Sequence, residues 1–475
     1  MKRTSIFVFA ALAVTALGVA LGAYLLRQPE PSGKTDLWRG PADTTSPLAE
    51  AVKFTPYPAL APTDEEQKDF RARLAKLAIK RLVEYYGMDK DKNVVFSPVC
   101  SMSTLGMMLP AASGSTEQVI LDELCMSGCT PEWVLNNFRE YFTELKNLDK
   151  GITPVVKPEP PPEETEELLV SDGDPYDAMC TFRTANSVWT NKRWTGRPEF
   201  ARNVGAFLFG DAFSTPFDRR AQEDADAWIA RKMTGLMNHV GLGKVDRDTA
   251  LVAISAALFS SRWMTYYSDP FFPVENTKDR VFTVSEGQKR NCPFMELFSA
   301  WRYEESPYFR AVDIPFCLKG TYMRLVLPSE ELGVKRFLEL LPKIWLDRDE
   351  WAFGTVPGTV RLPKFDYRCE YEKQPFIIVP GELRLDRAYA VAPETTLGSR
   401  SRQVAEIEID ERGTKAIAIE ITETYGGYGG GRGEPPPPPF ELTFDRPFVF
   451  FIMESGSEVP LFAGIVNDPT DRGKK

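Results

Sequence analysis

The side chains that most often carry out chemistry in proteins are scarce or scattered in this sequence. His239 is the single histidine, so a histidine-based triad or a metal site with several histidines would have to use this one residue. Its segment, LMNHVGLG, is typical of a helix end or a turn. No nucleophile has a recognisable general base beside it, and 67 acidic residues make any single carboxylate pair uninformative. We therefore expect a protein that is not an enzyme and needs no cofactor.

The cysteines also argue against a catalytic or metal site. There are seven, an odd number in a chain of 475 residues that is too long to need disulfides for its stability. Cys125 and Cys129 are close enough to form a bridge or to share a metal ion. No second pair of ligands has the spacing of a zinc site, so we favour free thiols and expect no metal.

The overall composition is that of a globular protein with an acidic balance. Hydrophobic residues make up 43% of the chain and aromatic residues 12%, which is enough for a sizeable core. The net charge is -10, whereas binding to nucleic acid requires clustered Lys and Arg. We expect no nucleic-acid partner.

The N-terminus predicts export. An uncharged apolar run extends from Ser5 to Leu26, after Lys2 and Arg3, and is close to the length that crosses a bilayer. Its length favours an uncleaved signal anchor, whereas the small residues near its end suit a cleavable signal peptide: Ala20, Gly22 and Ala23. In both cases the bulk of the chain is expected outside the cytoplasm, either secreted or anchored in the membrane by residues 5–26.

Three segments have the composition of linkers or loops. Residues 28–63 are rich in Pro, Ser and Thr, which predicts a disordered tether after the targeting segment, residues 1–27. Residues 151–177 are acidic and Pro-rich, which predicts a surface insertion, with an acidic docking loop as the alternative. In residues 425–439, YGGYGGGRGEPPPPP, a flexible glycine stretch is followed by an extended polyproline run.

The remaining sequence predicts helices first and strands later. Apolar residues at three- and four-residue spacing predict helices over residues 65–87, 116–124, 131–148 and 221–236, the last with Trp228 and Ile229 inward. From about Leu251 short β-branched and aromatic runs predict many strands, including VAEIEID, FELTF, FVFFIM and PLFAGIV. This order predicts an α+β fold with large mixed or antiparallel sheets.

Nine segments then resemble one known family, the serpins, in the family's own order. FSPVCSMSTLGMML (residues 96–109) is similar to the family's Phe-Ser-Pro segment and its helix. The other matches are TANSVW, ADAWIARKMTG, FSSRW, PVENTKDRVFTV, LPKF, EIDERGTKA, DRPFVFFI and PLFAGIVNDP. They span about Asp64 to Pro469, so we expect a serpin domain over residues 64–475, in an exported or anchored member from a bacterium.

The resemblance implies an α+β fold with three β-sheets, eight or nine helices and an exposed reactive-centre loop at about residues 411–440. In the family a serine protease, or a papain-like cysteine protease, cleaves this loop and forms an acyl-enzyme. The loop then inserts as a strand in the main sheet and traps the protease. The implied activity is protease inhibition by a suicide substrate that works without a cofactor. We expect a monomer.

The resemblance also assigns the hinge of the loop and the bond that is cut. A hinge that must turn and then become a strand requires a small flexible residue followed by short side chains. The positions that match the family's hinge are Glu411, Gly413, Thr414, Ala416 and Ala418. Counting seventeen residues from the hinge glutamate, as in inhibitory serpins, places the cut after Gly427. Tyr425, Tyr428 and Arg432 are better specificity residues for chymotrypsin-like or trypsin-like enzymes.

Two features leave a non-inhibitory binding or scaffold serpin open as the alternative. The period of two places Glu420 on the same face as Thr414, so insertion would bury a carboxylate, which costs free energy unless it is paired. The polar cluster at which the sheet opens, called the shutter, is also altered. Ser97 is retained, while the other matching positions are Cys100 for a serine, Ser255 for an asparagine and Gln403 for a histidine.

Overall fold

The structure is a computed structural model, and only part of the chain is described. The described residues are 36–37, 57, 59–89, 92–148, 180–233, 245, 249–264, 271–284, 287–318, 320–346, 353–373, 385–389, 401–414 and 438–473. The predicted targeting segment, residues 1–27, and the predicted insertion, residues 151–177, lie outside this set. No helix in the described ranges is both long enough and apolar enough to cross a membrane.

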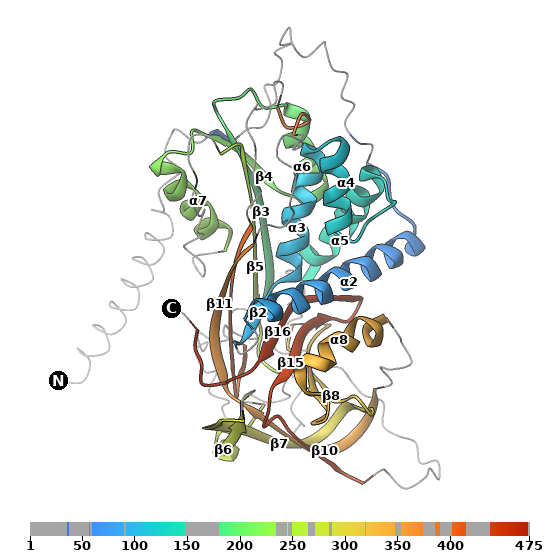
Figure 1. Ribbon diagram of the computed structural model, residues 1–475, viewed down its shortest axis with the longest axis vertical. Coiled ribbons are helices and arrows are strands. Elements are labelled where there is room, and N and C mark those ends of the chain that lie inside the picture. The colour runs from blue at the N-terminus through green and yellow to red at the C-terminus, as the bar shows by residue number, and fades with distance from the viewer. Residues whose placement is uncertain are drawn as a thin grey trace, which may run out of the picture.

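Most of the helices gather at one end of the molecule, against both faces of a sheet, and one lies in the other half (Figure 1). The described part has seven α-helices, where the resemblance implied eight or nine for the whole chain. Local signals explain where two of them begin. Thr63 and Glu66 form a reciprocal capping box at the start of the helix Asp64–Met88, and Pro131 is the first residue of the helix Pro131–Leu148. The helices are α2 (Asp64–Met88), α3 (Pro98–Met108), α4 (Gly114–Glu123), α5 (Pro131–Leu148), α6 (Pro198–Leu208), α7 (Arg219–Lys232) and α8 (Gly333–Leu346), with 3-10 turns at Leu109–Ala111 and Val274–Asn276.

The strands form three sheets, as predicted. A four-stranded sheet has the order β1 (Asp36–Leu37), β4 (Asp211–Thr215), β3 (Thr181–Asn191) and β5 (Leu251–Ser260). A three-stranded sheet has the order β11 (Phe365–Lys373), β12 (Ser401–Asp410) and β13 (Gly413–Thr414). The nine-stranded sheet has the order β14 (Phe440–Thr443), β10 (Gly354–Pro363), β7 (Lys289–Glu305), β8 (Phe309–Pro315), β9 (Thr321–Pro328), β15 (Phe448–Glu454), β16 (Ser457–Val466) and β2 (Val94–Phe96), with β6 (Lys278–Thr283) paired to β7.

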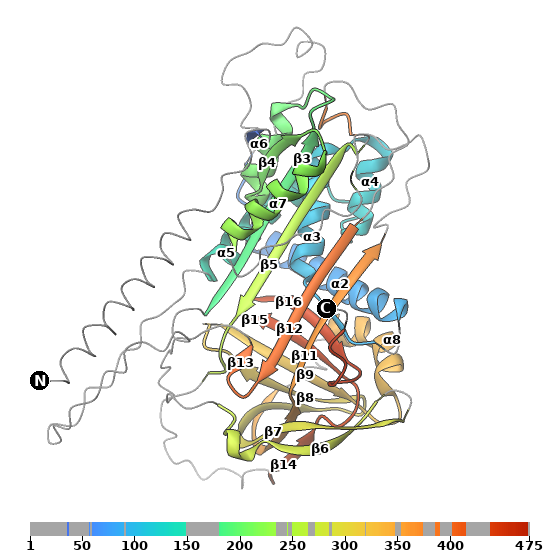
Figure 2. The same ribbon diagram turned by 90° about the vertical axis from the view of Figure 1, so that its left-hand side faces the viewer.

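The two smaller sheets face each other edge to edge, with β5 and β12 running in the same direction (Figure 2). Among the described residues β5 pairs along its length with β3 alone, and β12 pairs with β11 and β13. Backbone N–H and C=O groups on the facing edges of β5 and β12 therefore have no ladder between them in the described residues. This pair of edges is the place where a further strand can be added.

Separate hydrophobic clusters cover the two faces of the four-stranded sheet. On one face α7 packs with Trp228 and Ile229 against Trp189 and Phe213 of β3 and β4. On the other face α3, α5 and α6 join the largest cluster, which also contains Ile407 and Ile409 of β12. The predicted inward placement of Trp228 and Ile229 is confirmed, since both are buried.

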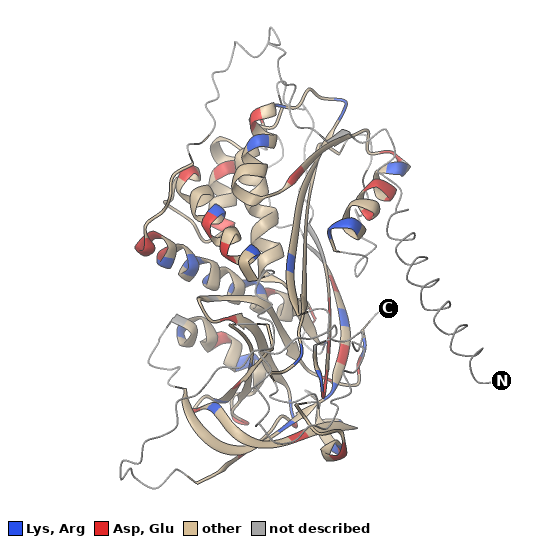
Figure 3. Ribbon diagram, turned by 180° about the vertical axis from the view of Figure 1, so that it is seen from behind, with Lys and Arg blue, Asp and Glu red and all other residues tan. Residues whose placement is uncertain are grey.

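Charged residues of both signs are distributed over the described surface (Figure 3). The long helix α2, for example, carries acidic and basic residues along its length.

All seven cysteines are free thiols. The preference for free thiols over a Cys125–Cys129 bridge is confirmed.

Candidate functional site

The start of the predicted loop lies between the facing edges of β5 and β12. Gly413 pairs with Asp410 at the end of β12 and also forms an antiparallel bridge with Arg262, just beyond β5. Thr414, the next residue, pairs with Ile409. The predicted hinge therefore begins as a short strand, β13, which pairs with the end of β12 and bridges to a residue just beyond β5.

The backbone at Gly413 can be formed only by glycine without strain. Its φ angle is +140°, a region that residues with a Cβ rarely adopt. A Cβ here would lie 2.5 Å from the Ser261 carbonyl oxygen and 2.6 Å from the Arg262 Cα. Because both atoms belong to the backbone, they cannot move aside easily.

Glu411 fixes the hinge to the strands below it. Its carboxylate accepts hydrogen bonds from Lys364 Nζ and Thr277 Oγ1, each at 2.8 Å. Burial raises the pKa of Glu411, but the hydrogen bonds from Lys364 and Thr277 outweigh this effect and leave the pKa below its ordinary value. The ionised carboxylate is thus the stable form in the folded protein.

Trp263 holds the other side of the same turn. Its backbone N–H donates to the Arg412 carbonyl at 2.9 Å, and its indole Nε1 donates to the Asp410 carbonyl at 3.0 Å. The ring is buried and stacks on Phe316, with 4.7 Å between ring centroids. Since Trp263 follows β5, these bonds tie the end of β5 to the end of β12.

Asp410 completes the turn from β12 into the hinge. Its Oδ1 accepts hydrogen bonds from the backbone N–H groups of Arg412 at 2.8 Å and Gly413 at 3.2 Å. Such side-chain to backbone bonds stabilise tight turns. The reversal of the chain at Glu411 and Arg412 is therefore determined by local chemistry on both sides.

The register of β13 gives the face on which the hinge residues lie. Thr414 is opposite Ile409, whose side chain is buried in the large core. Residues opposite each other in a ladder share a face, so the Thr414 position is on the core face. The other predicted loop positions lie outside the described residues: Ala416, Ala418, Tyr425, Gly427, Tyr428 and Arg432.

Three of the four predicted shutter residues are brought together under the sheet. Ser97 caps α3, accepts from the Cys100 N–H at 3.4 Å, and donates to the Leu461 carbonyl at 2.9 Å. Burial raises the pKa of the Cys100 thiol to about 11, against the smaller effects of Ser97 and Ser255 beside it. The fourth, Gln403, lies on β12 opposite Tyr371 of β11.

Sequence reasoning missed the residues that hold the hinge from outside the loop. Lys364 and Trp263 stand in the quoted segments LPKF and FSSRW, and Thr277 in PVENTKDRVFTV, but none was given a role. Their partners are more than 130 residues away for Trp263 and Thr277, so no local pattern connects them. The sequence offered no signal for them beyond their presence in the segments that resemble the family.

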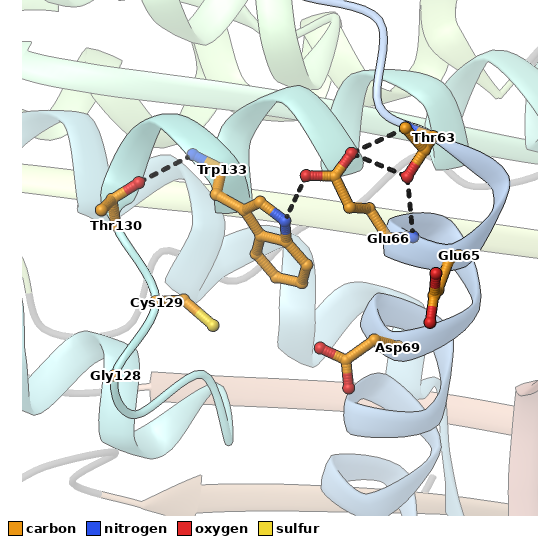
Figure 4. Close-up of a pocket in the computed structure, with 8 residues that line it drawn as sticks. All are labelled: Thr63, Glu65, Glu66, Asp69, Gly128, Cys129, Thr130 and Trp133. Atoms are coloured by element: carbon orange, nitrogen blue, oxygen red, sulfur yellow. Dashed lines mark hydrogen bonds between the residues drawn. The ribbon is translucent and has the colours of Figure 1, made fainter.

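A surface pocket of about 560 Å³ lies between the start of α2 and the loop before α5 (Figure 4). Glu66 accepts a hydrogen bond from the Trp133 indole Nε1 at 3.1 Å, and Asp69 pairs with Arg73. Both acidic side chains therefore have partners within the protein. None of the residues that line this pocket belongs to the predicted hinge.

Comparison with known proteins gives one consistent family. The family model described as "Serpin (serine protease inhibitor)" matches residues 72–469. Plasminogen activator inhibitor 1 of Sus scrofa is 24% identical over 426 residues, covering 84% of this chain and 92% of its own length. An uncharacterized serpin-like protein of Methanosarcina acetivorans is 24% identical over 409 residues, covering 81% of this chain and 84% of its own.

Solved structures agree on the fold. The thermophilic serpin tengpin in its native state has a TM-score of 0.64 at 19% identity, with 89% of this chain and 98% of tengpin covered. Cleaved Serpin 42Da has a TM-score of 0.66 at 19% identity, with 86% of this chain and all of that chain covered. The family model, the relatives and the fold together show that this chain is a member of the serpin family.

Proposed function

We propose that this serpin inhibits a serine-type endopeptidase as a suicide substrate. The observation that carries the proposal is the position of Gly413 and Thr414, which begin a strand between the facing edges of β5 and β12. A strand that continues from Thr414 would find unpaired backbone groups on both sides. The two open strand edges and the first residues of the proposed inserting strand are therefore aligned.

The covalent step is an ordinary acylation by the protease. The protease serine oxygen attacks the carbonyl carbon of the scissile peptide bond, an ester forms, and the new amino terminus leaves with a proton. The freed loop then extends β13 between β5 and β12 before water can cleave the ester. A papain-like enzyme would form a thioester in the same way.

The hinge contacts favour this mechanism over a rigid binding protein. Glu411 and Trp263 hold the turn at one point, so the base of the loop is fixed beside the facing edges of β5 and β12. Gly413 supplies the backbone freedom that a moving hinge requires. The anchored turn would give the inserting strand a fixed starting point.

The test is a search for a covalent complex. The full-length protein, in mild detergent, is mixed with chymotrypsin, trypsin, elastase, subtilisin and papain and analysed on a denaturing gel. We expect one enzyme to give a stable band at the summed mass, with the cut between Tyr425 and Arg432 by mass spectrometry. Clean cleavage without this band for every enzyme would favour the binding or scaffold alternative.

A pair of variants tests insertion itself. Thr414→Arg places a long charged side chain on the core face and should convert the inhibitor into a plain substrate. Ile417→Arg is the matched control. Position 417 is three residues after Thr414 and would lie on the opposite face of an extended strand, so this variant should retain most of the complex. Equal inhibition by the parent and Thr414→Arg would contradict insertion.

We also propose that the protein acts outside the cytoplasm, on the basis of the apolar run Ser5 to Leu26 and the preceding Lys2 and Arg3. Protease added to intact cells should degrade the domain after residue 63. N-terminal sequencing of the membrane and medium fractions distinguishes a retained anchor from a cleaved signal peptide.

A further inference from the structure

The strand β11 is the outer strand of the three-stranded sheet. Among the described residues it forms a ladder with β12 along one edge only. Backbone groups on the other edge point away from this sheet, and such a row of groups can pair with an extended segment of another chain. The structure must therefore contain a feature that covers this edge, or the edge is open to a partner.

Residues near the end of the chain cover the middle of this edge. The Arg368 N–H on β11 donates to the Arg472 carbonyl at 3.2 Å, and Gly473 forms a parallel bridge with Arg368. Gly473 has a φ of +70°, and a Cβ added there would lie 2.1 Å from the Arg368 carbonyl oxygen. A glycine is required for the two backbones to approach this closely.

A buried asparagine holds the chain in position for this contact. Asn93, which is 7% exposed, donates from Nδ2 to the carbonyls of Asp468 at 2.7 Å and Asp471 at 3.0 Å. Its Oδ1 accepts from the backbone N–H groups of Asn467 at 2.8 Å and Asp468 at 2.9 Å. Its own carbonyl accepts from the Cys369 thiol of β11 at 3.1 Å. One residue thus sets the path by which the chain reaches β11.

Polar contacts hold the same segment from the outside. Arg290 pairs with Asp468 at 3.1 Å, and Lys92 pairs with Asp471 at 3.5 Å. Asp471 Oδ1 also accepts a hydrogen bond from the Gly473 N–H at 3.0 Å. Exposed ion pairs contribute little individually, so the bonds to Asn93 carry most of the anchoring. The contact of Gly473 with β11 is therefore built into the fold.

We call residues 467–473 the edge guard, and we propose that they keep a second copy of this chain from pairing with β11. The partner that the guard excludes is β11 of that second copy, in antiparallel pairing about a twofold axis. In such a pair each edge satisfies the backbone groups of the other, so both copies gain the same hydrogen bonds.

The charges on β11 favour this partner. The backbone groups that point outward belong to every second residue, as the Arg368 N–H shows. Antiparallel pairing about Tyr367 would place Asp366 of each copy opposite Arg368 of the other, and Glu370 opposite Lys364. Each of these opposite-charge pairs occurs twice because of the symmetry. The edge that the guard covers is thus complementary to itself.

The first experiment displaces the guard in the full-length protein, kept in mild detergent. One variant ends at Asp471, and the other is Gly473→Ala, whose new Cβ would meet the Arg368 carbonyl oxygen. Gly287→Ala is the matched control, because Gly287 has a similar φ of +74° and no atom within 4 Å of the added Cβ. Sedimentation velocity, with the detergent matched in density by the solvent, measures the mass of the protein particle over a range of concentrations.

Displacing the guard should produce a dimer. We expect the parent and Gly287→Ala to stay monomeric, and both guard variants to dimerise with an association constant at least about tenfold higher than that of the parent. Circular dichroism and urea unfolding show that each variant is folded. Folded guard variants that remain as monomeric as the parent would overturn the proposal.

Amide exchange and a charge exchange identify the edge that pairs. In the shortened chain the Arg368 N–H should exchange faster than in the parent when the protein is dilute, and should be protected again in the dimer. Adding Arg368→Glu should abolish the dimer, because a glutamate would then face Asp366 of the other copy, and adding Asp366→Arg as well should restore it. A dimer that is insensitive to Arg368→Glu would show that the copies meet at another surface, and the assignment of β11 would be wrong.

Discussion

Lys364 Nζ donates a hydrogen bond of 2.8 Å to Glu411 Oε2, and this pair joins the residue before β11 to the base of the predicted reactive-centre loop. The Glu411 side chain is 9% exposed and that of Lys364 35%, so the carboxylate is the more buried partner. Removing the lysine would leave a buried charge with Thr277 as its remaining side-chain donor. The contact thus determines how firmly the hinge is anchored.

Lys364→Ala should therefore destabilise the intact protein. We expect a loss of about 2–3 kcal/mol in the free energy of unfolding, because a buried, hydrogen-bonded carboxylate loses its charged partner. Urea unfolding measures the effect. Lys335→Ala, at an exposed lysine on α8, is the control and should change stability by less than about 0.5 kcal/mol. Equal effects of the two substitutions would show that the pair contributes nothing.

The lowered pKa of Glu411 predicts a loss of stability in acid. The folded protein holds this carboxylate ionised more strongly than the unfolded chain does, so its contribution is present above the unfolded pKa of about 4.3. The contribution is lost as the pH falls through the lower, folded pKa. Melting curves between pH 7 and pH 3 should fall more steeply for the parent than for Glu411→Gln. Parallel curves would contradict this assignment.

Glu454 should show the opposite behaviour. Burial raises its pKa, with Glu144 as a further negative neighbour and the Gly456 N–H and Arg71 acting against these effects. The folded state therefore binds the proton more tightly, and this residue's contribution declines as the pH rises above about 4.3 towards the folded pKa. Glu454→Gln should raise the melting temperature at pH 7.5, and the gain should shrink on acidification to pH 4. A gain that is the same at both pH values would contradict the sign.

Gly413→Ala should disrupt the hinge more than a glycine substitution elsewhere. The added Cβ would lie 2.5 Å from the Ser261 carbonyl oxygen at a φ of +140°, so the backbone between Asp410 and Thr414 must shift. We expect a loss of at least about 2 kcal/mol in stability and faster amide exchange at Trp263. Gly87→Ala in α2 is the control. No atom lies within 4 Å of the Cβ that this substitution adds, so it should leave stability unchanged or raise it.

Much of the architecture could be predicted because its determinants are local. The helix predicted over residues 131–148 is α5 (Pro131–Leu148), since a proline at its start and a 3.6-residue apolar period are both local signals. The strands FELTF, FVFFIM and PLFAGIV are β14, β15 and β16, because alternating or continuous apolar runs specify extended chain directly. The ordered motifs then predicted the family, which the family model confirmed.

The anchoring of the hinge could not be derived in the same way. Trp263 and Asp410 are 147 residues apart, and Thr277 and Glu411 are 134 residues apart. A motif shows that a tryptophan or a threonine is present, but not which carbonyl or carboxylate it meets. That information exists only once the strands have been brought together.

The sequence by itself determined that this chain is an α+β serpin, because composition, period and motif order can be read from neighbouring residues. The tertiary structure alone decided that Gly413 bridges the end of β5 and the end of β12, and that Trp263, Thr277 and Lys364 hold the turn between them. The reason is that strand order and register are fixed by hydrogen bonds between distant segments, and a shift of one residue would turn every side chain of a strand to the opposite face.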